Sequence, residues 1–213
     1  MEKEYYIIGS GGFAKEVYFL AEETLEDDYS FGGFIDFEPK VKKQKVRGKE
    51  ENVLDEEYFL SQVAPQDNRF LFMGVGAPEL LYKLSNKFKQ YNFPNLIHPG
   101  FIGDRSSIKF GRGNIITGGC VFTVDISIGS FNLFNLMTSV GHDTSIGDCN
   151  VFNPACNISG MVKIGSRNLF GVNSTVLQEL EVKNDNIIGG ASLANKPVES
   201  ESVVVGVPAK KIK

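Results

Sequence analysis

The sequence of 213 residues lacks any run of 18 apolar residues, which a helix would need in order to cross a membrane. The segment from Met1 to Glu4 has neither the basic start nor the apolar core of a signal peptide. Cysteine is scarce: there are three, an odd number, which favours free thiols in a reducing compartment. We therefore expect a cytoplasmic protein that makes no use of a membrane.

Histidine is scarcer still, since His98 and His142 are the only two. A zinc enzyme that relies on several histidine ligands would need more of them, so we expect no metal site. The net charge of −4 gives no support for a nucleic-acid partner. Apolar residues make up 42% of the chain and charged residues 23%, which is typical of a globular protein with room for two modest domains.

A six-residue repeat of large apolar side chains dominates the second half of the chain. Its fourteen stations are Phe110, Ile116, Phe122, Ile128, Phe134, Val140, Ile146, Phe152, Ile158, Ile164, Phe170, Val176, Val182 and Ile188. From Phe110 to Ile164, every third station is followed by glycine, at Gly111, Gly129, Gly147 and Gly165. Asparagine recurs at positions 114, 132, 150, 168 and 186. The true repeat is therefore eighteen residues long and consists of three hexapeptides.

This period fits neither an amphipathic helix nor a lone strand. It predicts a parallel β-solenoid, in which three strand-and-turn units close one triangular coil and residues eighteen apart stack about 4.8 Å from each other. The asparagine column is expected to mark a corner in the left-handed backbone conformation, which asparagine tolerates. A column of small residues indicates a tight corner, at Cys120, Thr138, Cys156, Ser174 and Ser192. A sandwich of irregular strands is the alternative, but fourteen consecutive matches disfavour it.

The first part of the chain has the pattern of a mononucleotide-binding βα unit. Tyr5–Ile8 is an expected strand, Gly9–Ala14 a glycine-rich turn and Lys15–Glu23 a helix, followed by a second strand at Gly33–Asp36. Such glycines let the backbone approach phosphate oxygens, and a helix N-terminus favours negative charge. Asp36 is spaced to bind a ribose hydroxyl. A turn that only tightens the packing of strand against helix is the alternative.

Further elements are expected before the repeat begins. Arg69–Gly74 reads as a buried strand that leads into a Gly74–Gly76 loop, with a helix from Pro78 to Gln90. Val53–Val63 reads as a short helix, and the basic run Lys40–Lys49 as a solvated loop, with a phosphate contact as the alternative. With about 95 residues there is room for one mononucleotide half, which weighs against a NAD dehydrogenase.

His142 is the first candidate for chemistry. It follows the station Val140 by two residues, which places it at a coil corner rather than in the core. Counting by eighteen puts Val124 before it and Gly160 after it, so a gap and an open backbone N–H lie beside the imidazole. A base next to such a donor suits acyl transfer from a thioester, where a proton is removed and an oxyanion forms.

Asp143 could orient the imidazole of His142 as the acid of a triad does, unless the two side chains point to opposite faces of a strand. An ordinary exposed corner residue is the alternative reading of His142. His98 does not stand a multiple of eighteen residues from His142, so the two cannot share a metal between adjacent coils. His98, which precedes Pro99, is expected to be structural.

On these motifs the whole chain resembles the hexapeptide-repeat acyltransferases. Within that family it looks like the branch of bacterial sugar acetyltransferases of the sialic acid O-acetyltransferase and nucleotide-amino-sugar N-acetyltransferase type. The resemblance implies a Rossmann-like nucleotide-sugar-binding domain at residues 1–94, a left-handed parallel β-helix at 95–194 and a C-terminal tail at 195–213. It also implies homotrimers with active sites between neighbouring subunits.

The resemblance further implies roles for individual residues. His142 would be the general base and Asp143 its acidic partner. Acetyl-CoA would contact Ser159, Gly160, Gly171, Val172, Gly190, Ala191, Pro208 and Lys210. The nucleotide-linked sugar would contact Gly9, Ser10, Gly11, Gly12, Phe13, Asp36, Gly74 and Gly76. Phe13 is a departure, because several relatives carry histidine at this position.

The function that follows from the resemblance is acetyl-CoA-dependent N-acetylation of a nucleotide-linked amino sugar of the 4-amino-4,6-dideoxy type, for glycan or O-antigen synthesis. Two alternatives stay open: a sugar O-acetyltransferase that acts on a substrate such as sialic acid, and a non-catalytic β-helix scaffold with a nucleotide-sensing domain.

Overall fold

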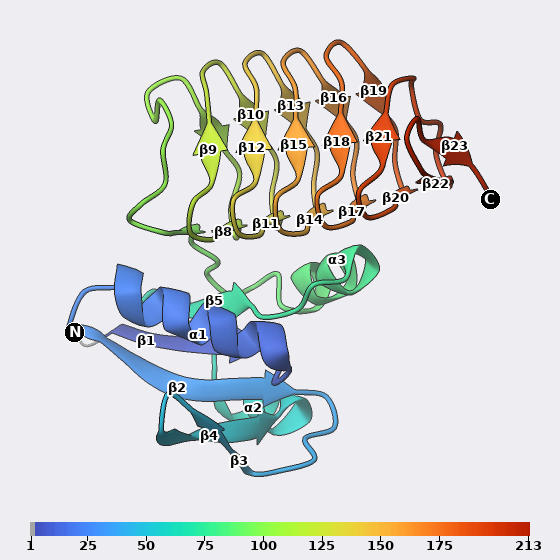
Figure 1. Cartoon of the computed structure of the whole chain (residues 1–213). Coiled ribbons are helices and arrows are strands. Elements are labelled where there is room, and N and C mark those ends of the chain that lie inside the picture. The colour runs from blue at the N-terminus through green and yellow to red at the C-terminus, as the bar shows by residue number, and fades with distance from the viewer. Residues whose placement is uncertain (1–2) are drawn as a thin grey trace.

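The computed structural model describes residues 3–213, so Met1 and Glu2, the start of the segment without a signal-peptide pattern, lie outside the described residues. The chain forms a small α/β domain followed by a long left-handed β-helix. Figure 1 shows the β-helix above the α/β domain. In residues 3–213 no helix is both long and apolar enough to cross a membrane.

The α/β domain is built on one five-stranded sheet with the strand order β3-β4-β2-β1-β5. Its elements are β1 (Lys3–Ile8), α1 (Gly12–Thr24), β2 (Tyr29–Asp36), β3 (Lys43–Val46), β4 (Lys49–Asp55), α2 (Glu56–Gln62), β5 (Arg69–Met73) and α3 (Pro78–Lys87). Strands β1, β2, β4 and β5 are parallel, so their carboxyl ends share one edge. This confirms the predicted strand, glycine turn and helix, and the two later strands.

Two predictions for this domain were wrong. The helix expected at Val53–Val63 begins only at Glu56, because residues 53–55 continue strand β4 and pair in register with β2. The expected loop at Lys40–Lys49 contains strand β3, which pairs antiparallel with β4. A basic edge strand looks like a loop in sequence, since lysines on an exposed edge replace the apolar alternation.

The β-helix has three sheets, one for each face of a triangular prism. One sheet consists of β7 (Lys109–Phe110), β10 (Ser127–Ile128), β13 (Ser145–Ile146), β16 (Lys163–Ile164) and β19 (Glu181–Val182). The second consists of β9 (Val121–Phe122), β12 (Ser139–Val140), β15 (Asn157–Ile158), β18 (Thr175–Val176) and β21 (Leu193–Ala194). The third runs through β6 (Leu96–Ile97), β8 (Ile115–Ile116), β11 (Leu133–Phe134), β14 (Val151–Phe152), β17 (Leu169–Phe170), β20 (Ile187–Ile188), β22 (Val203–Val205) and β23 (Lys210–Lys211).

The apolar columns fill the prism as the repeat predicts. Val140 pairs with Ile158 and Phe152 with Phe170, eighteen positions apart. The rings of Phe152 and Phe170 stack with centroids 4.5 Å apart, and those of Phe134 and Phe152 with centroids 4.7 Å apart. These distances match the spacing of hydrogen-bonded strands, so the strand ladder itself sets the aromatic stack.

The role predicted for the asparagine column was wrong. The left-handed corner residue is the one before each asparagine, as at Cys149 (φ 57) and Arg167 (φ 58). The asparagines are buried and form a ladder, in which Asn150 Nδ2 donates to Asn132 Oδ1 at 3.0 Å and to Gly165 O at 2.9 Å. The column is therefore kept by buried backbone groups that need partners, not by backbone conformation.

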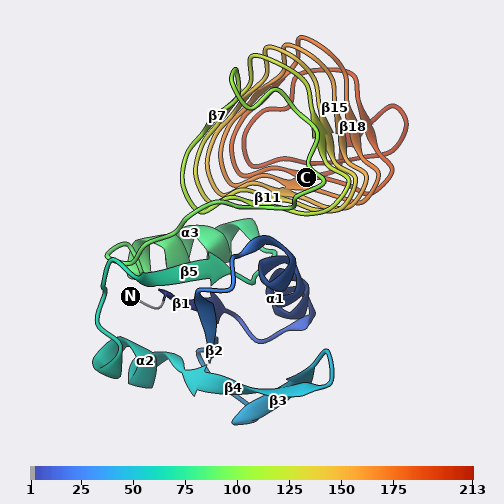
Figure 2. The same ribbon diagram turned by 90° about the vertical axis from the view of Figure 1, so that its left-hand side faces the viewer.

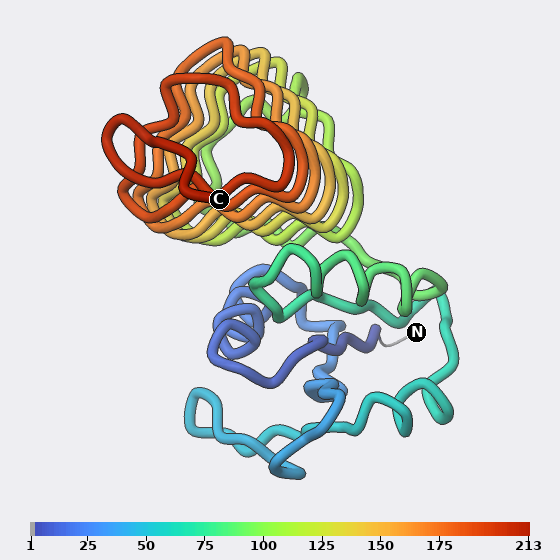
Figure 3. The backbone as a smooth tube through the Cα atoms, turned by 90° about the vertical axis from the view of Figure 1, so that its right-hand side faces the viewer, coloured from blue at the N-terminus to red at the C-terminus, as the bar shows by residue number. Residues whose placement is uncertain are grey.

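The α/β domain packs against one face of the prism. The outward side chains of Ile115, Leu133 and Val151, on strands β8, β11 and β14, are buried in the same cluster as the core of the α/β domain. Viewed along the coil axis in Figure 2, helices α3 and α1 lie beneath this face, with strand β5 below helix α3. The opposite view in Figure 3 shows the same layering. Because these side chains are buried in one cluster, the two domains share an apolar interface.

Candidate functional site

His142 lies at the corner that joins strand β12 to strand β13. Its Nδ1 is 2.7 Å from Oδ2 of Asp143, and the two side chains are 53% and 58% exposed. Asp143 has φ 56, so the chain turns sharply between the two residues. The alternation that would separate neighbouring side chains on a strand does not apply at this corner, and the carboxylate reaches the imidazole.

Gly160, one coil later, leaves room beside the same imidazole. A Cβ at Gly160 would lie 2.7 Å from His142 Nε2. Within residues 3–213 the backbone N–H of Gly160 donates to no acceptor. A Cβ at Gly141 would lie 2.5 Å from this nitrogen, so glycine at position 141 keeps the N–H uncovered. The second imidazole nitrogen and an open backbone donor thus face one space, as the eighteen-residue count predicted.

His98 serves the backbone instead. Its Nδ1 accepts a hydrogen bond from the N–H of Gly100 at 2.9 Å, which closes the turn that leads into the β-helix. Across residues 3–213 there is no group of three or more histidine, cysteine or acidic side chains placed to hold a metal ion.

The residues predicted to bind acetyl-CoA fall into two groups. Ser159 and Gly160 share the corner of His142, whereas the other six lie at the next corner or on the tail. A Cβ at Gly171 would touch the backbone nitrogen of Gly190 at 2.4 Å, so these two corners stack directly. The tail joins the same stack, because the N–H of Leu193 donates to Gly206 O and that of Ala209 to Leu193 O. This brings Val172, Ala191, Pro208 and Lys210 into the C-terminal part of the prism.

The predicted nucleotide site coincides with a cavity of about 220 Å³ at the carboxyl edge of the α/β sheet. Gly9, Ser10, Gly11 and Asp36 line it. The hydroxyl of Ser10 donates to Asp36 Oδ2, which ties the glycine loop to the end of β2. The backbone of the glycine loop and the carboxylate of Asp36 therefore border one hollow, an arrangement that mononucleotide-binding units share.

Other predicted contacts lie outside this hollow. A Cβ at Gly74 would meet Ile7 Cγ2 at 2.6 Å and Ala14 Cβ at 2.8 Å, so glycine there allows helix α1 to pack closely. Val75, rather than Gly74 or Gly76, lines the cavity. Gly12 begins helix α1, and Phe13 packs against the apolar core of the domain.

Sequence reasoning missed several cavity residues, namely Phe37, Glu56, Leu80 and Leu84. Two of them could have been found from their positions in the sequence, because Phe37 directly follows strand β2 and Glu56 directly follows strand β4, at the same edge of the sheet. The misassigned helix at Val53–Val63 hid the second of these strand ends. The residues of α3 could be found only once its contact with the sheet edge was known.

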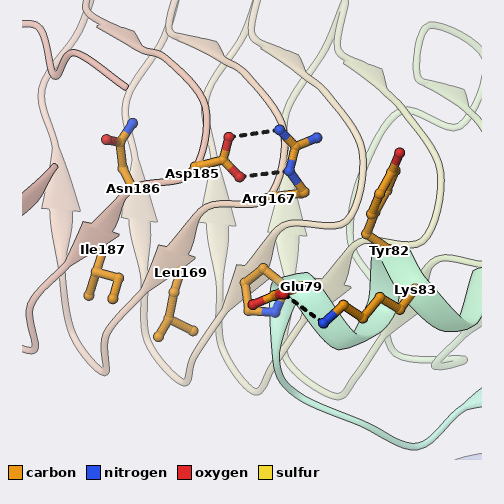
Figure 4. A pocket seen from close by; sticks show the side chains of 9 residues that line it. Glu79, Tyr82, Lys83, Arg167, Leu169, Asp185, Asn186 and Ile187 are labelled. Carbon is orange, nitrogen blue, oxygen red and sulfur yellow. Dashed lines mark hydrogen bonds and ion pairs between the residues drawn. The ribbon is translucent and has the colours of Figure 1, made fainter. Parts of the chain in front are cut away.

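A larger hollow of about 630 Å³ lies between helix α3 and the β-helix (Figure 4). Its charged side chains bond mainly to one another: Arg167 donates to both oxygens of Asp185 at 2.6 and 2.7 Å, and Lys83 pairs with Glu79 at 2.7 Å. The guanidinium of Arg167 also lies 5.3 Å from the ring centroid of Tyr82. The groove therefore carries mutually paired charges at the junction between the domains, and Arg167 lies at a different corner of the prism from His142.

Comparison with known proteins agrees with this architecture. Residues 4–88 match the family model described as the PglD N-terminal domain. No curated protein matches the chain. PerB from Caulobacter crescentus, solved in complex with CoA and GDP-perosamine, is 25% identical with a TM-score of 0.86, over 100% of this chain and 99% of that one.

Two further structures share the fold. The acetyltransferase domain of PglB from Neisseria gonorrhoeae FA1090, in complex with acetyl coenzyme A, is 20% identical with a TM-score of 0.87 over 100% of both chains. WeeI from Acinetobacter baumannii AYE is 22% identical with a TM-score of 0.81, over 99% of this chain and 100% of that one. The first domain thus matches the PglD N-terminal family, and the chain as a whole is similar to bacterial sugar acetyltransferases that carry a hexapeptide β-helix.

Proposed function

We propose that this protein is an acetyl-CoA-dependent N-acetyltransferase that acts on a nucleotide-linked amino sugar of the 4-amino-4,6-dideoxy type. The observation that carries the proposal is the corner where His142, paired with Asp143, faces the open N–H of Gly160. The nucleotide cavity in the same chain and the CoA and GDP-perosamine bound by PerB support the choice of substrates.

In the proposed reaction, Nε2 of His142 accepts a proton from the sugar amine as its nitrogen attacks the thioester carbonyl. The carboxylate of Asp143 holds Nδ1 protonated and stabilises the imidazolium that forms. The N–H of Gly160 donates to the developing oxyanion. As the new C–N bond is completed the C–S bond breaks, and the imidazolium returns its proton to the departing thiolate.

We further propose that the active unit is a cytoplasmic homotrimer. Gly171, Val172, Gly190 and Ala191 lie at a different corner of the prism from His142, across the sheet that contains β12 and β15. A neighbouring subunit would bring its own corner to the His142 corner, so that one CoA contacts both chains. Acetyl-CoA would then be a co-substrate held mainly along the β-helix.

The test is the rate of CoA release from acetyl-CoA with nucleotide-linked amino sugars as acceptors. His142→Asn should lower kcat at least about 100-fold, the usual contribution of a general base, while the KM for acetyl-CoA stays close to that of the wild type. His98→Asn is the matched control and should keep activity. Release of CoA only with hydroxyl acceptors would replace the proposal by sugar O-acetylation. No release with any acceptor would favour a scaffold.

A further inference from the structure

Glu56 is a buried carboxylate on the wall of the nucleotide cavity. It is 4% exposed and lines the hollow together with Asp36 and Phe37. The capping of helix α2 does not require it, because Asp55 already accepts the N–H of Tyr58 at 3.0 Å. A buried charge is costly unless it is paired, so its place at this wall calls for a partner.

That partner is Lys87, from the end of helix α3. Its Nζ donates to Oε1 of Glu56, and its side chain is still 45% exposed. Lys87 follows Leu84, a lining residue, by three positions and so lies on the same side of α3. Within residues 3–213, Lys87 is the hydrogen-bond partner of the Glu56 carboxylate, and Oε2 has none. One acceptor and one donor therefore lie side by side next to the cavity.

Phe37 and Asp36 indicate where a base would lie relative to this pair. Asp36 stands where a ribose is held in such domains, at the carboxyl end of β2. Phe37, the next residue, is 65% exposed at the rim and offers a ring on which a base can stack. Glu56 follows β4, the neighbouring strand, so a base that extends from the ribose along the sheet edge approaches Glu56.

We propose that Glu56 and Lys87 read the nucleobase, and that they select bases with an –NH–C(=O)– edge. The carboxylate accepts the ring N–H while the ammonium donates to the adjacent carbonyl oxygen. Uracil, thymine, guanine and hypoxanthine present this edge, whereas cytosine and adenine present an amino donor beside a ring-nitrogen acceptor. This inference rests on the proposed function, since it assumes that a nucleotide-linked sugar occupies the cavity.

The test is calorimetric titration of the full chain with two matched pairs of free nucleotides, UDP against CDP and IDP against ADP. Within each pair only the hydrogen-bonding edge of the base differs. UDP and IDP should bind at least about tenfold more tightly than CDP and ADP, in keeping with the discrimination of a two-point contact. Equal affinities within both pairs for the wild-type chain would overturn the proposal.

Variants show whether the Glu56–Lys87 pair selects the nucleobase or only joins helices α2 and α3. Glu56→Gln should reduce the ratio of UDP to CDP affinity below about threefold, whereas Glu57→Gln, a change of an exposed carboxylate one residue away, should not alter it. Phe37→Leu should weaken all four nucleotides and keep the ratio. If Glu56→Gln folds and keeps the wild-type ratio of UDP to CDP affinity, the ion pair has only a structural role and the proposal is overturned.

The assay of CoA release distinguishes failure of base selection from failure of the proposed function. Acetylation of a nucleotide-linked amino sugar without discrimination between bases would overturn only the role of Glu56 and Lys87 in base selection. Binding of none of the four nucleotides, together with acetylation of free sugars, would overturn both this role and the nucleotide-linked acceptor.

Discussion

Oδ2 of Asp143 lies 2.7 Å from Nδ1 of His142 because Asp143 occupies the left-handed corner of its coil, with φ 56. One coil earlier Asp125 has the same φ of 56, but Val124 precedes it instead of histidine. The repeat thus places one aspartate beside the candidate base and an equivalent aspartate where no base exists. Asp125 is therefore a built-in control for Asp143, because the eighteen-residue repeat gives both aspartates the same backbone conformation.

We expect Asp143→Asn to lower kcat about tenfold or more, with little change in the KM for acetyl-CoA. The amide cannot stabilise the imidazolium, yet asparagine keeps the left-handed conformation. Asp125→Asn is the control and should keep wild-type kcat. Steady-state rates of CoA release measure both variants. Equal activity of the two would remove Asp143 from the positioning role.

Gly160→Ala should abolish most activity without unfolding the protein. The new methyl would lie 2.7 Å from Nε2 of His142, and this exposed ring can swing aside at small cost to stability. The displaced imidazole would then be misaligned with the acceptor amine. Gly118→Ala is the control, since its Cβ would meet His98 at an ordinary 3.6 Å. A Gly160→Ala enzyme with unchanged kcat would show that His142 works from another position.

The β-helix could be predicted because its signal is one-dimensional. Phe134, Phe152 and Phe170 stack because residues eighteen apart occupy equivalent places, and counting alone also found Gly160 beside His142. Counting positions could not show why asparagine recurs once in each coil. A conformational reason and a hydrogen-bonding reason both favour asparagine at one position in each coil, and only the structure separates them.

The α/β domain was predicted less completely because its site joins segments that are distant in sequence. Ser10 bonds to Asp36 and Glu56 to Lys87, and no period connects either pair. The glycine turn was visible since backbone geometry restricts the residue types there. A lone buried glutamate after a strand has no such signature, so the inner wall of the cavity emerged only from the fold.

Asn150→Ala should destabilise the β-helix by about 2–4 kcal/mol, because it leaves buried backbone groups without partners. Asn150 Oδ1 accepts the N–H of Asn168 at 2.9 Å, and Asn150 Nδ2 donates to Gly165 O at 2.9 Å. Asn157→Ala, which removes an exposed asparagine, is the control and should cost less than about 1 kcal/mol. Urea unfolding measures both. A loss no larger than that of the control would mean that water replaces the ladder.

Stability should fall as the pH rises from 9 to 11, because burial raises the pKa of the Cys120 and Cys149 thiols from 9.0 to about 11. In this window the unfolded chain has lost these protons while the folded chain still holds them, so ionisation favours unfolding. Burial also raises the pKa of the Tyr5 hydroxyl, which extends the effect to higher pH.

Cys120→Ser isolates the contribution of one thiol to this alkaline loss. Serine fits the site, because Ser174 fills the equivalent corner three coils later and is fully buried there. Urea midpoints at pH 8, 9, 10 and 11 should decline less steeply for this variant than for the wild type, since serine does not ionise in this range. Parallel declines for both proteins would assign the alkaline loss to groups other than the Cys120 thiol.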